Sequence, residues 1–591
     1  VYGNLQLWGY YPSHHGLFKM TGSFFNPGPY AGYLAAVFPI ALGFYFFDNS
    51  VRVPTQHPIF VKLTSYCIHI KASFKKVPFI THFFDNNSIG EPTPGAQLQV
   101  PEHTNCFFLK YLALISIICM FLVLPASRSR AAWLAVAVSS IYLIAIRYRL
   151  YSRAKDYFDT RIKQIFLLAS FIVLLTITGA GLYQMKKGSA DGRVLIWKVS
   201  MNIIKERPVF GYGFDQFKAH YMDYQADYFE QNPNSEDVLV AGDNNYAFNE
   251  PIQLMVENGL IGILLLVAII WLVFPVQYKT RLSKETKEER TTNNNTGLSL
   301  QADQIPVEET GQNWDLLPFS RAVILSVLVF GLFSYPFQIL PIKICLVVAL
   351  ATASGLMGRK VKTYRQQTFV PQTVRFALKS FILIGSIGLF WLATERIQHI
   401  QTAYSDWKNA FDIYNIGIYN DCLDDYKKAY PVLKTNGDFL TNYGKALSMA
   451  EKYPEAVGVL QQAAKYYPNT VVYTALGDSY KKLRQTAQAE QAYLHAWHMN
   501  PSRFYSKYLL AKLYDETGQH EKAVATAKEL LGKEVKIEST AVKEIQEEMR
   551  KIIEKQENSQ NIFNPKGKGR KHNQRVATAS CPAPFLKKKV R

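Results

Sequence analysis

The sequence predicts an all-α protein in two parts, a polytopic transmembrane helical bundle followed by an α-solenoid of helical repeats. Eight apolar runs, each about long enough to cross roughly 30 Å of hydrocarbon, lie between residues 30 and 393. From about residue 437 the pattern changes, and small and aromatic residues recur every 33–34 positions. The mean hydropathy of -0.05 is close to zero because it averages these two parts.

The apolar runs define the expected spans. We place them at 30–47, 108–124, 131–146, 165–182, 259–276, 321–339, 342–357 and 376–393. Pro336 and Pro341 interrupt the apolar sequence between the sixth and seventh spans, which favours a tight helical hairpin there.

Lysine and arginine counts predict the orientation of these spans. The loops 48–107, 147–164, 277–320 and 358–375 carry 5, 6, 5 and 5 basic residues, whereas the segments 1–29, 125–130 and 340–341 carry 1, 2 and 0. Because cytoplasmic loops collect Lys and Arg, we expect the first set to be cytoplasmic. The long loop 183–258 and everything after residue 393 are then expected on the outer side.

The formal charge of +20 has explanations other than nucleic acid. The predicted cytoplasmic loops hold part of it, and the tail from Lys566 to Arg591 is basic and expected to be disordered. No nucleic-acid-binding motif is present. The 6 cysteines contain no CxxC pair, so the sequence suggests neither a disulfide framework nor a metal site. Since the chain starts at Val1 without a signal peptide, we expect further membrane helices before it.

Three copies of a helical-repeat pattern follow the bundle. The recurring positions are Tyr443-Gly444, Leu447, Ala456, Leu460, Ala463 and Pro468, then Leu476-Gly477, Tyr480, Ala489, Tyr493, Ala496 and Pro501, then Leu510-Ala511, Tyr514, Ala523 and Ala527. A small residue at the Gly/Ala position lets the two helices of a unit approach closely, and the proline marks the end of the second helix. These spacings resemble the tetratricopeptide repeat. A degenerate earlier copy is expected over 403–436, with Tyr414 and Tyr426 in packing roles.

Such arrays stack into a superhelix with a concave binding surface. Partner binding and a spacer role are both open for this one. The expected domains are therefore a membrane domain over 1–393, a repeat domain over 394–555 and a basic tail over 556–591.

Candidate chemistry lies on the outer side. The turn 125–130 keeps Arg128 and Arg130 on the side that disfavours cations, where they either snorkel to headgroups or bind an anion such as a diphosphate. The large loop opens with Arg193 on an amphipathic helix, which Gly211 and Gly213 are expected to end. It closes with Asn249, Gln253 and Glu257 on one helix face and Glu250 about a hundred degrees away. Carboxylates at the membrane edge are costly and often functional.

Four segments in order resemble the O-antigen ligase and polymerase superfamily, which are membrane glycosyltransferases of the bacterial envelope. They are Gly22 to Leu34 (GSFFNPGPYAGYL), Ser129 to Leu134 (SRAAWL), Arg193 with Trp197 and then Pro208 to Phe214, and Asn249-Glu250 with Gln253, Gly259 and Gly262. The resemblance covers roughly residues 20–280.

The resemblance implies a glycan donor on a polyprenyl diphosphate carrier and an acceptor that is lipid A-core, another glycan or a protein. It implies that Arg130 and Arg193 bind the diphosphate and that no metal ion or other cofactor is needed. Arg128 and Asn249 are further candidates for binding the diphosphate or the substrate. It further implies a multi-pass protein of the bacterial inner membrane, which places the repeats in the periplasm.

One position departs from the family pattern. The family's closing motif begins with a histidine that acts as general base, and this chain has Phe248 there. Glu250 or His220 could substitute as the base, the acceptor could need little base help, or the activity could have been lost or changed. A non-catalytic envelope scaffold that recruits partners through the repeats is therefore the alternative function, and a transporter is a third.

Overall fold

The computed structural model describes residues 2–13, 18, 20–24, 26–47, 104–150, 187–275, 316–358 and 372–563, with a few isolated positions between 151 and 186. The fourth expected span (165–182) lies outside the described residues apart from such positions. So do the tail from residue 564 onward and most of the four loops expected to be cytoplasmic.

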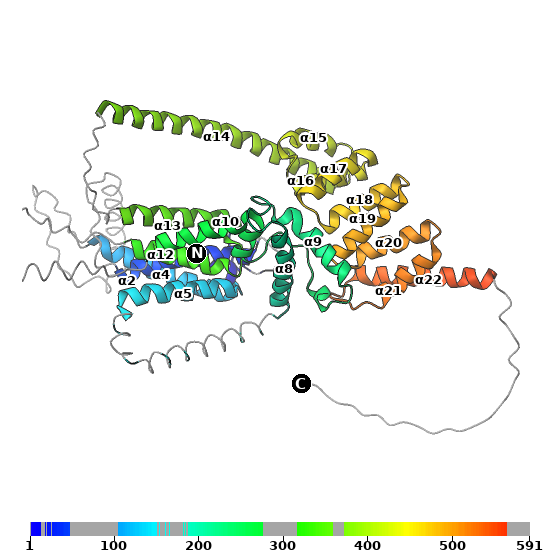
Figure 1. The fold of residues 1–591 in the computed structure, drawn as a ribbon, viewed down its shortest axis with the longest axis horizontal. Helices are drawn as coiled ribbons and strands as arrows, with labels where there is room; N and C mark the ends of the chain where they lie inside the picture. Colours follow the sequence, from blue (N-terminus) through cyan, green and yellow to red (C-terminus); the bar gives the residue numbers. More distant parts are fainter. Residues whose placement is uncertain are drawn as a thin grey trace, which may run out of the picture.

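A bundle of apolar helices forms the first part of the molecule (Figure 1). Its helices are α2 (Pro27–Phe47), α4 (Thr104–Ala126), α5 (Arg130–Arg147), α10 (Glu250–Val273), α12 (Leu317–Gly331) and α13 (Leu340–Gly358). Helix α2 lies at the centre and contacts α4, α5, α12 and α13. Glycines allow α2 to approach α12 closely. A Cβ at Gly32 would lie 2.4 Å from the Phe330 ring, and one at Gly43 would lie 2.6 Å from Phe319, so neither position has room for a side chain.

Five of the described helices are long and apolar enough to cross a membrane: Pro27–Phe46, Arg130–Arg147, Glu250–Val273, Leu340–Met357 and the apolar part of Phe376–Asn415. Two shorter apolar helices, Lys110–Ala126 and Leu317–Gly331, pack among them. These seven coincide with every expected span except the fourth. The chain is therefore a multi-pass, all-α membrane protein with a helical solenoid.

The sixth span was predicted too far along the chain. Helix α12 begins at Leu317 and ends at Gly331, and residues 332–339 form the turn into α13. Pro336 starts the short 3-10 helix η5 (Pro336–Gln338) in that turn. Helix α12 ends at Gly331, before Pro336, and proline suits the first position of the next short helix because the N–H that it lacks would have no partner there.

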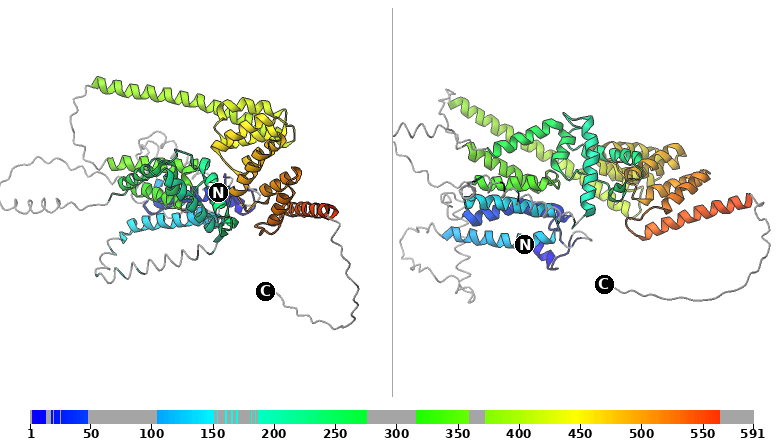
Figure 2. Two further views of the ribbon diagram at one scale, coloured as in Figure 1. Left: turned by 45° about the vertical axis from the view of Figure 1, so that its right-hand side comes forward. Right: turned by 60° about the horizontal axis from the view of Figure 1, so that its bottom comes forward.

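The two ends of the bundle differ. At one end Arg147 Nε donates to the Phe46 carbonyl at 3.0 Å, and Arg321 Nε donates to the Val273 carbonyl at 2.8 Å. At the other end lie the α4–α5 turn, the start of α10 and the α12–α13 turn. That end adjoins helices α8 (Lys187–Glu206) and α9 (Phe217–Gln231), with the repeats beyond them (Figures 1 and 2).

The second part is a stack of helix pairs that begins with one long helix. Helix α14 (Gln372–Asn415) runs without a break through residue 394, where the domain boundary was expected. Its apolar first part is exposed on all sides, as a lipid-facing helix would be, and its last turns pack against α15 (Cys422–Leu433). The following helices are α16 (Gly437–Met449), α17 (Tyr453–Tyr466), α18 (Thr470–Lys482), α19 (Thr486–Met499), α20 (Phe504–Glu516), α21 (His520–Leu531) and α22 (Thr540–Phe563).

The helix pairs are packed through the glycines that the repeat pattern singled out. A Cβ at Gly444 would lie 2.5 Å from Leu460, and one at Gly477 would lie 2.3 Å from the Tyr493 ring. Each glycine lies on the first helix of a pair, and the side chain that fills the space comes from the second. Tyr426 is fully buried and stacks on Tyr443 with ring centroids 5.3 Å apart.

The repeats dock on the long loop through α9 and α19. The Gln225 amide donates to the Met499 carbonyl, and Met499 is buried in the same core as Tyr221 and Phe229. His495 Nε2 lies 2.9 Å from Asp223 Oδ1. Solenoid and loop therefore share a hydrophobic core.

Candidate functional site

The turn before α5 is held by its own side chains. Ser127 Oγ donates to the Leu124 carbonyl at 2.6 Å and accepts from the Ser129 N–H at 3.3 Å. Trp133 Nε1 donates to the same Leu124 carbonyl at 2.8 Å. Arg128 has a φ of 49°, a left-handed conformation that turns the chain sharply. Arg130 is the first residue of α5 and so projects from a rigid corner of the bundle.

The structure brings Arg130 close to Arg193. Arg193 lies on α8 and is partly buried. Burial lowers its pKa, and the positive charge of Arg130 lowers that pKa further. The two arginines, which the sequence placed on separate segments, therefore lie within electrostatic reach of each other and form an arginine pair.

Phe248 lies beneath Arg193. The Arg193 Cζ is 5.6 Å from the centre of the Phe248 ring, a cation–π distance. Phe248 meets the Tyr335 ring edge-on at 5.2 Å, and Tyr335 stacks on Tyr246 at 4.5 Å. We call Tyr246, Phe248 and Tyr335 the aromatic cluster. It joins the closing segment of the loop to the α12–α13 turn.

Sequence reasoning missed Tyr335. It precedes Pro336 in a segment that was read as the end of a span, and it lies beyond the stretch that resembles the ligase family. Its phenol raises the pKa of Arg193 through a Coulombic interaction, opposing the effects of burial and of Arg130. The sequence feature that could have pointed to Tyr335 is an aromatic residue next to a proline at the membrane edge.

The backbone at Phe248 is held in an unusual conformation. Its φ is 51°, which is rare for a bulky residue. The preceding residue is fixed on both sides, because Trp197 Nε1 donates to the Ala247 carbonyl at 2.9 Å and the Ala247 N–H donates to Gln253 Oε1 at 3.2 Å. This geometry directs the Phe248 ring to Arg193 and Tyr335.

Asn249 and Glu250 tie the start of α10 to the α12–α13 turn. Asn249 caps α10 by accepting from the Ile252 N–H at 3.0 Å, and its Nδ2 donates to the Leu332 carbonyl at 3.1 Å. Glu250 is buried, and its Oε1 accepts from the Phe337 N–H at 2.7 Å. Both side chains thus have structural partners next to the aromatic cluster.

His220 belongs to a different cluster between α8 and α9. Its ring centroid lies 4.2 Å from that of Tyr212, whose hydroxyl donates to Glu206 at 2.8 Å. Burial lowers the pKa of His220, and the nearby Asp223 raises it. In the described contacts, His220 interacts with these residues rather than with the arginine pair.

The glycines of the loop have a role other than the expected one. Helix α8 ends at Glu206, before Gly211 and Gly213, because Pro208 disfavours helix at the residue that precedes it. Gly211 has a φ of 68°, and a Cβ there would lie 2.5 Å from the Glu257 backbone. The glycines therefore let segment 208–213 lie directly against α10.

Helix α10 is broken at the matching point. Gly259 has φ 60° and ψ -157°, which no helix contains. The carbonyls of Val256 and Glu257 accept from Tyr212 and Gly213 at 2.9 and 2.8 Å, and Leu260 donates to Pro208 at 2.9 Å. The break exposes backbone groups at the membrane edge, and the loop segment satisfies them.

Fold and site together define a multi-pass helical membrane protein with an arginine pair at the end that faces its repeat solenoid. Residues 115–267 match the family model described as O-Antigen ligase, and residues 471–502 and 504–532 match that of the tetratricopeptide repeat. Both resemblances read from the sequence are therefore confirmed: the chain carries a segment of a membrane glycan ligase or polymerase family and, after it, tetratricopeptide repeats.

The comparisons with individual proteins are distant. No curated protein matches the chain. Among solved structures, the crystal structure of MamA protein is 17% identical, covers 29% of this chain and 99% of its own, and has a TM-score of 0.23. The crystal structure of the yeast Tom70 is 12% identical, covers 72% of this chain and 96% of its own, and has a TM-score of 0.24.

Proposed function

We propose that this protein transfers a glycan from a polyprenyl diphosphate carrier to an acceptor, which is lipid A-core, another glycan or a protein side chain. The observation that carries the proposal is that the fold brings Arg130, at the start of α5, and Arg193, on α8, close enough for their charges to interact, both within the stretch that matches the ligase family. Neighbouring cations repel each other, and a diphosphate bound between them would offset that repulsion. We add Arg128, two positions before Arg130, and Asn249, next to Phe248, to the proposed substrate-binding set.

The arginine pair suits the chemistry of the leaving group. As the bond between sugar and phosphate breaks, negative charge develops on the diphosphate. Cations that are already in place stabilise that charge without reorganising during the reaction. The Phe248 ring contacts the Arg193 guanidinium group, and the backbone of Arg130 is fixed as the first residue of α5.

The acceptor hydroxyl must also lose a proton. Phe248 cannot accept it, so we propose that Glu250 or His220 does so once the diphosphate has begun to leave. Glu250 lies two residues from Phe248, beside the aromatic cluster, and is the nearer candidate in sequence. His220 is partly buried against Tyr212 and would have to reach the acceptor from the α8–α9 side.

The proposed location is the bacterial inner membrane, with the reaction on the periplasmic side. Support comes from the basic loops, which predict a cytoplasmic location for the other end of the bundle, and from the repeats, which contact the same loop that carries Arg193. We take residues 1–393 as the transferase domain and residues 394–555 as a periplasmic repeat domain. A reporter that is active only in the periplasm, fused after residue 394, should be active. An inactive fusion would show that the orientation is the opposite of the one proposed.

The test of the activity is Arg130→Ala and Arg193→Ala in a strain that lacks the chromosomal gene. Each variant should lower glycan attachment by about 10²–10³-fold, the usual effect of removing one preorganised charge-stabilising group. Lys205→Ala is the matched control, because Lys205 is an exposed cation on the same helix as Arg193, and it should complement fully.

A second candidate function is a non-catalytic scaffold, which the replacement of the family histidine by Phe248 favours. In that case the repeats recruit glycan-assembly or other envelope proteins and the bundle is an anchor. Full complementation by both arginine variants would establish the scaffold and reject the transferase.

A further inference from the structure

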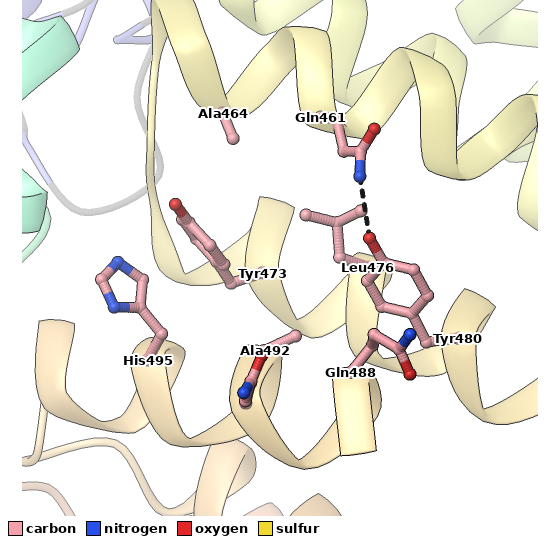
Figure 3. Close-up of a pocket in the computed structure, with 9 residues that line it drawn as sticks. Gln461, Ala464, Tyr473, Leu476, Tyr480, Gln488, Ala492 and His495 are labelled. Carbon is pink, nitrogen blue, oxygen red and sulfur yellow. Dashed lines mark hydrogen bonds between the residues drawn. The ribbon is translucent and has the colours of Figure 1, made fainter. Parts of the chain in front are cut away.

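The repeats contain an open groove that the proposed reaction does not use. It has a volume of about 430 Å³ and lies between α17, α18 and α19. Its polar lining consists of Gln461, Gln488, Gln491, Tyr473, Tyr480 and His495, with small apolar side chains between them (Figure 3).

The lining combines polar and apolar surface and holds no carboxylate, ammonium or guanidinium group among the described residues. Each glutamine amide offers an acceptor and two donors, which matches the paired donor and acceptor of neighbouring sugar hydroxyls. The tyrosine rings add apolar faces on which the C–H side of a sugar ring can pack. Three amides and two phenols on one concave surface therefore suit a neutral, hydroxyl-rich ligand better than a charged peptide.

Part of the groove is already in place. Gln461 Nε2 donates to the Tyr480 hydroxyl at 2.9 Å, which links α17 to α18 (Figure 3). The Tyr473 and His495 rings lie 4.4 Å apart, and His495 Nε2 lies 2.9 Å from Asp223 on α9. One wall of the groove is thus fixed to the loop that carries Arg193.

We propose that this groove binds a neutral glycan chain and holds it beside the loop that handles the lipid-linked donor. The proposal rests on the proposed function for its source of ligand, since the glycan would be the growing product or the acceptor. It assigns the repeats a glycan-binding role in place of a spacer role, and it makes an extended peptide the competing occupant.

The test is direct binding by the full chain in lipid nanodiscs. The probes are an array of neutral bacterial oligosaccharides, an array of acidic ones and an array of unmodified peptides. The wild-type protein should bind neutral oligosaccharides, and the double variant Gln488→Leu/Gln491→Leu should bind them at least tenfold more weakly. Gln485→Leu is the matched control, because Gln485 is exposed near the start of the same helix and does not line the groove, and it should bind as the wild type does.

Three results would overturn the proposal: binding to peptides alone, binding to none of the arrays, or equal binding by the double variant and the wild type. Thermal unfolding shows whether the double variant is folded, and Tyr480→Ala, a change on a different helix, should weaken glycan binding too. The arginine variants separate this proposal from the activity. Arg130→Ala and Arg193→Ala should lose glycan transfer while keeping glycan binding in the groove. Retained transfer by both variants would reject the proposed transferase activity but would leave the proposal of glycan binding unaffected.

Discussion

Phe248 connects one of the two arginines to the α12–α13 turn. Its ring lies near Arg193 at a cation–π distance and meets the Tyr335 ring edge-on. The left-handed backbone at this residue is strained for phenylalanine, and the bonds to Ala247 sustain it. The conformation directs whichever side chain stands here toward the arginine pair.

Replacing Phe248 by leucine should weaken the site without unfolding the protein. The variant loses the cation–π contact to Arg193 and the edge contact to Tyr335, each worth roughly 0.5–1 kcal/mol. Glycan transfer should therefore fall roughly 3–10-fold, measured as the initial rate with lipid-linked donor in membranes. Phe214→Leu is the control, because Phe214 is 74% exposed in the same loop. An unchanged rate in Phe248→Leu would show that the ring does not contribute to the site.

At the level of the helices, the break in α10 determines where the loop lies. Gly259 interrupts the helix, and the segment around Gly211 binds the backbone groups that the break exposes. Both glycines have positive φ and touch the other segment's backbone, so neither position accepts a side chain. The large loop is thereby attached to the membrane bundle by main-chain hydrogen bonds rather than by side chains alone.

Gly259→Ala should destabilise this attachment. A Cβ at Gly259 would lie 2.3 Å from the Val209 carbonyl oxygen, and the positive φ is strained for alanine. We expect a loss of roughly 1–3 kcal/mol, seen as a lower unfolding temperature of the purified chain and faster hydrogen exchange over 208–213.

The matched control for this change is Gly458→Ala on α17. Nothing lies within 4 Å of a Cβ at Gly458, and alanine is the better helix former by about 1 kcal/mol. This control should be neutral or slightly stabilising. Equal behaviour of the two variants would show that the break in α10 does not need glycine.

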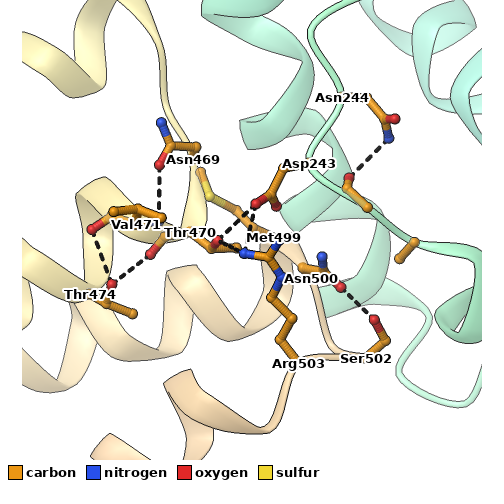
Figure 4. A network of polar contacts seen from close by, with 12 residues as sticks. Asp243, Asn244, Asn469, Thr470, Val471, Thr474, Met499, Asn500, Ser502 and Arg503 are labelled. Atoms are coloured by element: carbon orange, nitrogen blue, oxygen red, sulfur yellow. Dashed lines mark hydrogen bonds and ion pairs between the residues drawn. The ribbon is translucent and has the colours of Figure 1, made fainter. Parts of the chain in front are cut away.

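At the scale of the whole molecule, the solenoid reaches to within a few residues of the aromatic cluster. Asp243 Oδ2 lies 2.9 Å from Arg503 and accepts from the Thr470 hydroxyl at 3.0 Å (Figure 4). Three positions further along the chain, Tyr246 stacks on Tyr335. Occupancy of the repeats could thus affect the site through a short stretch of backbone.

Arg503→Ala should loosen this docking. The arginine side chain is half exposed, so the ion pair is worth at most about 1 kcal/mol. Hydrogen exchange over 241–249 should increase by a few-fold, with little change inside α20. Lys465→Ala, an exposed cation elsewhere on the repeats, is the control. Protection of 241–249 that survives Arg503→Ala would show that other contacts hold the segment.

The docked interface should weaken in acid. Burial lowers the pKa of His498; Glu230 and Glu529 raise it, and His495 and Lys507 lower it. A histidine with a lowered folded pKa binds fewer protons in the folded state than in the unfolded state. Its contribution to stability is therefore present above the unfolded pKa of 6.5 and is lost as the pH falls through the folded value.

His498→Gln should flatten this pH dependence. Between pH 7.5 and 5.5 the free energy of opening of α19, measured by hydrogen exchange, should fall less in the variant than in the wild type. One group can contribute a slope of at most about 1.4 kcal/mol per pH unit. Equal slopes in the two proteins would place the acid sensitivity elsewhere.

Particular residues show how far the sequence could be read. Gly444 and Gly477 were identified as close-packing positions from their spacing alone, and the structure confirms the contacts. The sixth span, by contrast, was predicted to extend past Pro336, because the apolar composition continues there. In the structure α12 already ends at Gly331, and the apolar residues that follow form a turn. Glu250 was singled out as a candidate base, but its hydrogen bond to Phe337 depends on a turn far away in the chain.

The local and periodic properties of this protein can therefore be read from its residues alone: the apolar helices, the repeat and the motifs that carry Arg130 and Arg193. These depend on the length of apolar runs and on residues within one or two helical turns of each other. Other features follow from the three-dimensional packing alone: Arg130 and Arg193 lie close together, Tyr335 packs against Phe248, Gly259 breaks α10, and the repeats dock on the loop. Those contacts join residues far apart in the chain, and packing of the whole fold selects them.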